Sequence, residues 1–193
     1  MNPEIINFKQ GGSMKIYRNY LSTERAGELL EKLINEMPWK RSDLVMYGKP
    51  LKTPRFQCWM ADTETKADVY SDTRVDWTPE MDSLRRELGA KLDFYFDYLL
   101  LNYYATGQDY IGYHADNEVV KNTDLIASVS LGGPRRFCVR PKKEADEKEV
   151  GEWHLESGDL VVMDGWMQRK YKHSVPKTAK KVEPRINLTF RKT

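Results

Sequence analysis

The chain has 193 residues, of which 40% are hydrophobic and 11% aromatic, so it can fold around a sizeable core as one domain. Its net charge of +2 disfavours a permanent nucleic-acid scaffold, although its Lys and Arg residues occur in local groups that suit transient phosphate contacts. The sequence has neither the ~18 consecutive apolar residues of a membrane helix nor the layout of a signal peptide, so we expect a soluble, intracellular protein without membrane contact.

The two cysteines, Cys58 and Cys138, lie far apart and neither belongs to a CxxC pair. A reduced pair of thiols is the ordinary interpretation of this arrangement, and a structural disulfide is the alternative. Too few cysteines are present for a zinc site built from thiolates.

The beginning of the chain predicts a loose arm followed by a strand and a helix. Residues 1–13 have no apolar period and contain two adjacent glycines, so we expect a loose N-terminal arm there. A short strand is expected over residues 14–17. Apolar residues then recur at helical spacing over residues 26–37, with Ser22 or Thr23 as the N-cap.

The segment from residue 39 to residue 77 is rich in aromatic residues and lysine but has no long apolar run. We expect short strands over residues 44–48 and 56–60, within hairpins and loops that cap one face of the core. A second helix is predicted to follow, with Thr78 as its N-cap and Pro79 at its first position. No glycine-rich phosphate loop occurs, which excludes the usual nucleotide-binding folds.

The second half of the chain is typical of short strands separated by turns, which favours a sandwich or jelly roll. Because helices precede strands, we predict an α+β fold. We expect one domain over residues 1–193, with helices and a substrate lid in 14–97 and a jelly-roll catalytic core in 98–193. The strands expected in this core cover residues 98–104, 125–131, 136–140, 153–155, 160–163 and 186–190.

A candidate metal site begins at His114 and Asp116. Residues two apart on a strand point to the same face, so both side chains can reach one ion. His173, from a later strand, is the expected third ligand, and two histidines with one carboxylate form the facial triad of non-haem Fe(II) oxygenases. His154 is the rival third ligand, but it alternates with its neighbours as on an ordinary surface strand, so we expect a structural role.

The last predicted strand carries Arg185 and Arg191, which are six residues apart and therefore project to one face. Arginine recognises carboxylates through two parallel hydrogen bonds. A dicarboxylic keto acid such as 2-oxoglutarate fits, with Asn102 and Tyr104 as further candidate donors. Salt bridges at the end of a strand are the alternative explanation for either arginine alone.

In chain order, these motifs resemble the signature of the AlkB family of Fe(II)/2-oxoglutarate-dependent dioxygenases, in its branch that repairs alkylated nucleic acids. The resemblance implies a double-stranded β-helix (jelly-roll) core with N-terminal helices and a nucleotide-recognition lid. It implies that His114, Asp116 and His173 hold Fe(II), with Arg191 among the catalytic residues. It also implies the residues that hold 2-oxoglutarate: Asn102, Tyr104, Arg185, Asn187, Thr189 and Arg191.

The resemblance extends to residues that would contact the substrate. Tyr47 matches the position of an aromatic wedge, and Tyr70 matches an aromatic residue that stacks on the flipped base. Asn117 and Glu118 follow the HxD motif, where family members contact that base, although Asn117 departs from the usual Asp or Lys. Arg55 is expected to contact a phosphate or a base edge. Simple packing is the alternative for Tyr47, Arg55 and Tyr70.

The function implied is oxidative demethylation of 1-methyladenine and 3-methylcytosine, with release of formaldehyde, succinate and CO2. The expected partner is nucleic acid that carries alkylated bases, with DNA favoured and RNA as a further substrate, and a monomer is the default. Two other classes stay open. One is a 2-oxoglutarate oxygenase that acts on a protein side chain or a small molecule, and the other is a catalytically silent nucleic-acid-binding module.

Overall fold

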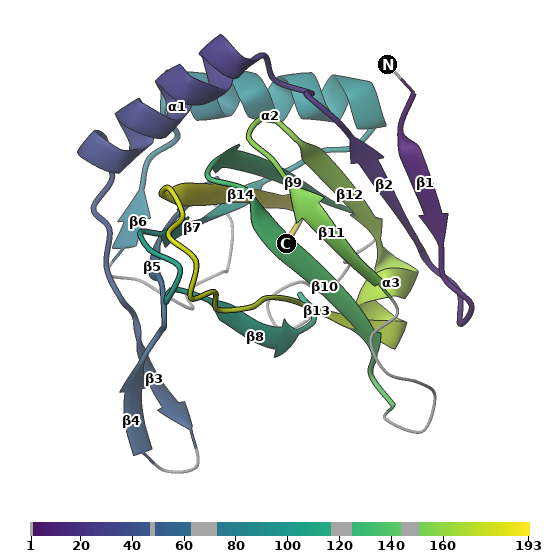
Figure 1. Ribbon diagram of the computed structural model, residues 1–193. Helices are drawn as coiled ribbons and strands as arrows, with labels where there is room; N and C mark the ends of the chain where they lie inside the picture. The colour runs from purple at the N-terminus through teal and green to yellow at the C-terminus, as the bar shows by residue number, and fades with distance from the viewer. Residues whose placement is uncertain (1, 47–48, 63–72, 117–124, 144–150) are drawn as a thin grey trace.

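The computed structural model describes residues 2–46, 49–62, 73–116, 125–143 and 151–193 (Figure 1). Most strands belong to two sheets, one with eight strands and one with four. The large sheet has the order β1 (Glu4–Asn7), β2 (Ser13–Tyr17), β12 (Leu160–Asp164), β9 (Leu125–Gly132), β14 (Arg185–Arg191), β7 (Tyr98–Tyr104), β5 (Phe56–Ala61) and β6 (Arg74–Val75). The small sheet has the order β11 (Gly151–Leu155), β10 (Arg135–Pro141), β13 (Tyr171–Val175) and β8 (Ile111–His114).

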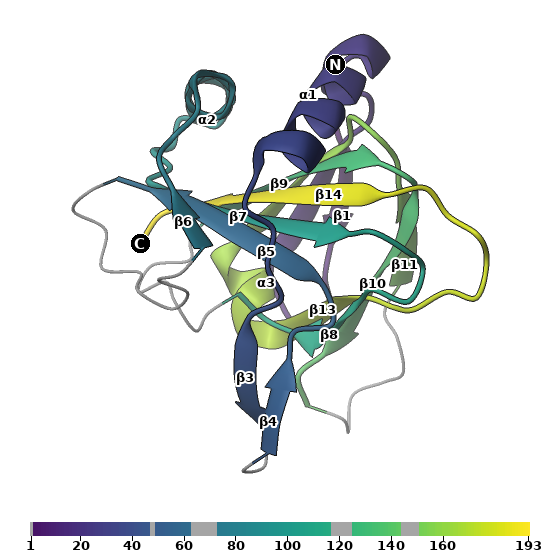
Figure 2. The same cartoon turned by 90° about the vertical axis from the view of Figure 1, so that its left-hand side faces the viewer.

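Two helices, α1 (Thr23–Glu36) and α2 (Pro79–Leu92), cover one face of the large sheet (Figure 2). As predicted, α1 is capped by Ser22, whose side chain accepts from the Arg25 N–H, and α2 is capped by Thr78 with Pro79 at its start. Buried leucines of these helices, such as Leu33 and Leu88, belong to one apolar cluster with residues of the sheet. The other side of the sheet is therefore left for the functional site.

A second apolar cluster fills the space between the two sheets. Met14, Ile126 and Val161 of the large sheet pack there with Phe137 and Val139 of the small one. Two facing sheets of this kind, with helices outside one of them, form the α+β jelly-roll core that the sequence predicts. Among the described residues, no helix is long and apolar enough to cross a membrane.

The expectation of a loose arm over residues 1–13 is wrong, because β1 pairs antiparallel with β2 from Glu4↔Ile16 to Asn7↔Ser13. Gly11 and Gly12 have φ values of 87° and 93°, so these glycines supply the left-handed backbone that the turn requires. The turn also buries Phe8 against the ring of Tyr171, with 4.7 Å between centroids.

The boundary expected at residues 97/98 does not separate a lid from the sheet core. Strands β2, β5 and β6 come from the first half of the chain, yet they lie in the same sheet as β7, β9, β12 and β14. The part that stands apart from both sheets is the hairpin of β3 (Asp43–Met46) and β4 (Lys49–Lys52) (Figures 1 and 2). Both cysteines are buried, Cys58 in β5 and Cys138 in β10, and no disulfide joins them.

Candidate active site

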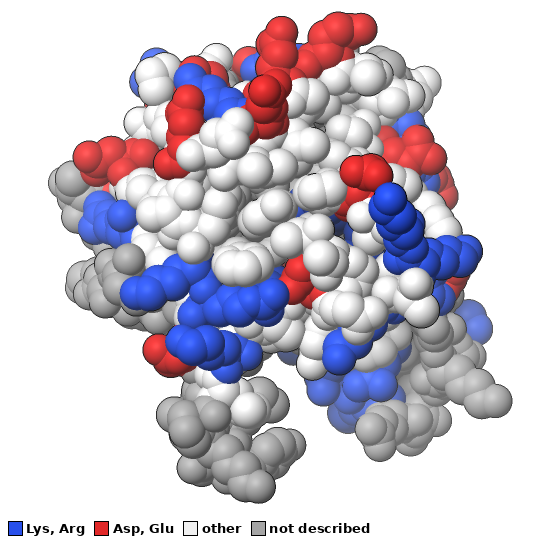
Figure 3. Space-filling model, turned by 60° about the vertical axis from the view of Figure 1, so that its left-hand side comes forward, with Lys and Arg blue, Asp and Glu red and all other residues white. Residues whose placement is uncertain are grey.

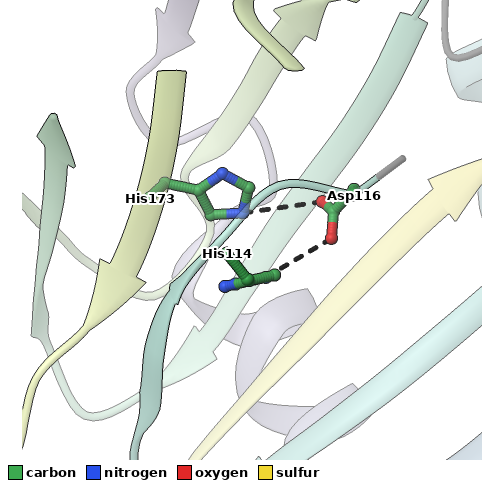
Figure 4. A group of neighbouring side chains, drawn as sticks. All are labelled: His114, Asp116 and His173. Atoms are coloured by element: carbon green, nitrogen blue, oxygen red, sulfur yellow. Dashed lines mark ion pairs between the residues drawn. The ribbon is translucent and has the colours of Figure 1, made fainter. Parts of the chain in front are cut away.

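The two histidines of the predicted triad lie on neighbouring strands of the small sheet. His114 ends β8 and is paired in register with His173 of β13, and Asp116 follows two residues after His114. Asp116 Oδ1 lies 3.4 Å from His114 Nε2, and Asp116 Oδ2 lies 3.5 Å from His173 Nε2 (Figure 4). One possible ligand atom of each residue lies within 4.8 Å of those of the other two.

Charges around this group favour the protonation states that bind metal. Burial alone would raise the pKa of Asp116, but Arg191 and His173 outweigh it and hold that pKa far below its ordinary value. Burial, together with the neighbouring His114, lowers the pKa of His173 to about 3. Asp116 is therefore ionised and His173 neutral near pH 7, as metal ligands must be.

Two hydrogen bonds orient His114 and Asp116. His114 Nδ1 lies 2.9 Å from the Gly112 carbonyl oxygen, which leaves Nε2 to face Asp116. Arg191 Nη2 donates to Asp116 Oδ1 at 2.9 Å. Two imidazoles and one carboxylate, each oriented by a neighbouring group, form the donor set expected for a non-haem Fe(II) centre.

A polar row lies along β14, as its alternation predicts. Asn187 Nδ2 donates to Thr189 Oγ1 at 2.7 Å, and Asn187 Oδ1 accepts from Ser128 Oγ at 3.1 Å. Arg185 Nη2 donates to the same Asn187 oxygen at 2.8 Å and to Ser130 Oγ at 2.9 Å. These side chains hold one another in place, and Asn187 and Thr189 line the same cavity as the triad.

Arg185 is 1% exposed, and its described hydrogen-bond partners are uncharged. Its Nε and Nη1 atoms, and Nε of Arg191, are buried and have no hydrogen-bond partner among the described residues. Burial lowers the pKa of Arg185 to about 10, so the guanidinium remains charged at neutral pH. Buried charges normally have a counter-charge, and the carboxylates of 2-oxoglutarate would supply one.

A cavity of about 840 Å³ opens beside the triad. Arg185 does not line this cavity; its guanidinium carbon lies 5.3 Å from the ring of Tyr104, which does. The remaining candidate ligands of the cosubstrate all reach the cavity wall: Asn102, Tyr104, Asn187, Thr189 and Arg191.

Arg55 is buried, so it does not lie on the surface where a phosphate contact would be made. Its side chain is buried at the cavity wall, and Nε donates to Asn102 Oδ1 at 2.6 Å. Gln57 Nε2 donates to the same oxygen at 3.0 Å. No sequence pattern marks Gln57, because the contact depends on the pairing of β5 with β7, where Gln57 lies opposite Asn102.

Four predicted substrate contacts, Tyr47, Tyr70, Asn117 and Glu118, lie outside the described residues. His154 lies on β11 with its side chain 64% exposed and its Nε2 3.8 Å from Glu152, and it is not part of the triad.

Sequence reasoning also missed two neighbours of the site. Phe137 stacks on the ring of His173 at 5.3 Å, and Gln168 accepts a hydrogen bond from the Asp116 N–H. Both contacts join segments that are distant in the sequence, so no local pattern marks them.

Comparisons with known proteins agree with this geometry. The family model of the 2OG-Fe(II) oxygenase superfamily matches residues 13–191. The chain is 32% identical to the DNA oxidative demethylase ALKBH2 of Arabidopsis thaliana, covering 96% of this chain and 68% of that protein. It is 29% identical to the alpha-ketoglutarate-dependent dioxygenase alkB homolog 3 of Homo sapiens, covering 91% of this chain and 64% of that protein. The chain thus spans about two thirds of the length of these relatives.

A viral protein of similar length also matches. The uncharacterized protein R406 of Acanthamoeba polyphaga mimivirus is 32% identical, covering 92% of this chain and 93% of that protein. The solved structure of OsALKBH1 superposes with a TM-score of 0.65 at 17% identity over 98% of this chain and 100% of that one, which shows a shared fold. Because the family model spans most of the chain and the Arabidopsis relative is similar over nearly all of it, the chain belongs to the 2OG-Fe(II) oxygenase superfamily and, within it, to the AlkB family.

Proposed function

We propose that this protein removes N-methyl groups from nucleic-acid bases by oxidation, with Fe(II), O2 and 2-oxoglutarate. The observation that carries the proposal is the compact group of His114, Asp116 and His173 beside a cavity backed by buried arginines. The relative from Arabidopsis thaliana is named as a DNA oxidative demethylase, which supports nucleic acid as the substrate class. The lesions we propose are 1-methyladenine and 3-methylcytosine, in DNA foremost and in RNA as well.

In this proposal, His114, Asp116 and His173 hold Fe(II). The residues that bind 2-oxoglutarate are Asn102, Tyr104, Arg185, Asn187, Thr189 and Arg191. When bound, Fe(II), O2 and 2-oxoglutarate supply a two-electron oxidation that hydroxylates the methyl carbon and releases succinate and CO2, after which the hydroxymethyl group leaves the base nitrogen as formaldehyde.

The chain's own residues position the metal ligands, supply positive charge for the cosubstrate and exclude water from the cavity. Arg191 restrains the Asp116 carboxylate through its hydrogen bond of 2.9 Å and also lines the cavity. The buried guanidinium of Arg185 provides positive charge behind Tyr104 for a carboxylate of the cosubstrate. Phe137 and Met163 line the same cavity, so an apolar wall keeps water from the reacting carbon.

Arg55 and Gln57 act on the cosubstrate side of the cavity in this proposal, because both fix the Asn102 side chain. The position of Arg55 at the cavity wall also lets it approach a base. By the family resemblance, we assign contacts with the flipped base and its flanks to Tyr47, Tyr70, Asn117 and Glu118. Stacking of a base on an aromatic side chain contributes about 1–3 kcal/mol, which offsets much of the cost of flipping it.

The charge distribution supports a polyanionic partner. Figure 3 shows Lys and Arg side chains gathered mainly across the lower half of one face, whereas many acidic side chains lie over the top of the view. Lys and Arg side chains that contact phosphates attract nucleic acids to a protein and make the binding dependent on salt concentration. A near-neutral protein with a local basic region suits brief contact with many substrate sites.

The test is a panel of oligonucleotides that carry 1-methyladenine or 3-methylcytosine in single- and double-stranded DNA and RNA. With Fe(II), 2-oxoglutarate and O2 supplied, we expect mass spectrometry to detect loss of the methyl group together with succinate. The His173→Ala variant serves as the control without an intact metal site. Turnover of 2-oxoglutarate with no loss of methyl from any oligonucleotide would instead indicate a protein side chain or a small molecule as the substrate.

A further inference from the structure

We propose that Gln168 is a positioning residue for the metal ligand Asp116, and that the turn between β1 and β2 supports it through helix α3 (Gly165–Lys170). This inference rests on the metal site assigned in the proposed function. It assigns a part in the metal centre to the N-terminal segment, which lies far from the triad in the sequence.

Gln168 is fully buried, and both ends of its amide are engaged. Its Oε1 accepts from the backbone N–H of Asp116 at 2.9 Å, and its Nε2 donates to Met163 Sδ at 3.5 Å. Asp116 lies beyond the end of β8, so its N–H is not part of the ladder of the small sheet. Without Gln168, this buried N–H would lose the acceptor that satisfies it.

Asp116 is thereby held at two points. Arg191 restrains the carboxylate, and Gln168 restrains the main chain that carries it. The two restraints act on different atoms and come from different elements, β14 and α3. A carboxylate held at both points stays in the geometry that the two histidines require, since small displacements of a ligand weaken a metal site.

The helix that carries Gln168 is fixed in turn by the N-terminal turn (Figure 1). The N-cap residue of α3 is Asp164, whose Oδ1 accepts from the Met167 N–H at 2.9 Å. Its other oxygen, Oδ2, accepts from the backbone N–H and the hydroxyl of Ser13, at 2.6 and 2.8 Å. A Cβ atom on Gly12 would lie 2.5 Å from Met167 N, so the turn and the helix are in direct contact.

The experiment measures binding of Co(II) to metal-free protein, followed by the visible absorbance of the bound ion, without 2-oxoglutarate or nucleic acid. The Gln168→Met variant keeps a side chain of similar length but removes the acceptor. We expect its Co(II) affinity to fall by about 10–100-fold, as is typical when a partner of a metal ligand is lost. Gln168→Glu keeps an oxygen that can accept the same N–H, so we expect it to retain most of the affinity.

Two further variants separate positioning from general stability. Leu88→Ala makes a hole in the helix-covered core on the opposite face of the large sheet, and we expect it to lower the melting temperature but to leave Co(II) affinity unchanged. Ser13→Ala removes one of the hydrogen bonds that support α3. We expect it to weaken Co(II) binding less than Gln168→Met does.

The proposal is overturned if Gln168→Met binds Co(II) within about twofold of the unmodified protein, a difference well under 1 kcal/mol. It is equally overturned if Leu88→Ala weakens binding as much as Gln168→Met at a similar loss of melting temperature. If Gln168→Met does not fold, the other two variants decide. Unchanged Co(II) affinity in Ser13→Ala overturns the support of α3 by the turn between β1 and β2. A Co(II) affinity of Gln168→Glu as low as that of Asp116→Ala overturns the role of the Gln168 acceptor.

Failure of the metal assignment itself gives a different result. The Asp116→Ala variant should lose Co(II) binding almost completely. If it binds Co(II) normally, the assignment of the triad is wrong, whatever the Gln168 variants show.

Discussion

Acidification of the metal-free protein should reveal the buried state of His173. Its pKa is about 3 in the folded protein against an ordinary value of 6.5, because burial and the neighbouring His114 disfavour the charged ring. The unfolded chain therefore takes up a proton first as the pH falls. The free energy of unfolding is fully retained above about pH 6.5 and decreases steadily between pH 6.5 and pH 3.

The size of this effect follows from the width of the pH window. Between pH 6.5 and pH 5 the unfolded state carries one more proton at this site, which costs about 1.4 kcal/mol of stability per pH unit, or about 2 kcal/mol in all. The lowered pKa of Asp116 acts in the same direction, but only below its ordinary value of 3.8. At pH 5 the contribution of Asp116 is therefore small, and comparison with a variant that lacks His173 separates the histidine contribution from that of other carboxyl groups.

The assay is urea unfolding of chelator-treated protein at pH 7 and at pH 5. The protein should lose about 2 kcal/mol more than the His173→Gln variant does between these pH values. His154→Gln makes the same substitution at a histidine with a 64% exposed side chain and should behave like the unmodified protein. Equal losses in His173→Gln and in the unmodified protein would refute a buried, neutral His173.

Three further predictions concern the cosubstrate, the N-terminal turn and the core. Arg185→Met should raise the 2-oxoglutarate concentration needed for half-maximal turnover by about 10–100-fold without changing Co(II) affinity, because the buried positive charge behind Tyr104 is lost. An unchanged requirement would contradict the assignment. Gly12→Ala should cost about 1–3 kcal/mol in urea unfolding, since φ is 93° and the new Cβ would meet Met167 N, whereas Gly11→Ala, with no atom within 4 Å of its Cβ, should cost less. Leu88→Ala should cost about 2–5 kcal/mol, and a loss below 1 kcal/mol would show that the core can collapse around it.

Features determined by neighbouring residues could be predicted from the sequence. The N-caps Ser22 and Thr78 and the first-turn Pro79 define their helices locally, and both helices form where expected. The two-residue spacing of His114 and Asp116 likewise indicates that both side chains share one face. Alternation along β14 explains how Asn187 and Thr189 reach the same cavity as Arg191.

Features that depend on tertiary pairing could not be read from the sequence. Strand β1 has only four residues and no clear alternation, and its place in the sheet depends on a turn whose two glycines also suggested flexibility. Helix α3 has six residues, which is too short for a helical period. The contact of Gln168 with Asp116 spans 52 residues, so neither residue type nor spacing marks it.

The two buried cysteines have a consequence for survival under chemical stress. Agents that methylate adenine and cytosine also attack protein nucleophiles, and for cysteine the reactive form is the thiolate. Burial raises the pKa of Cys58 to about 12, so this thiol stays protonated, and Cys138 is likewise shielded from solvent. Under the proposed function, the protein offers poor thiol targets to the same agents that create its substrate, and it should remain active in cells while such damage accumulates.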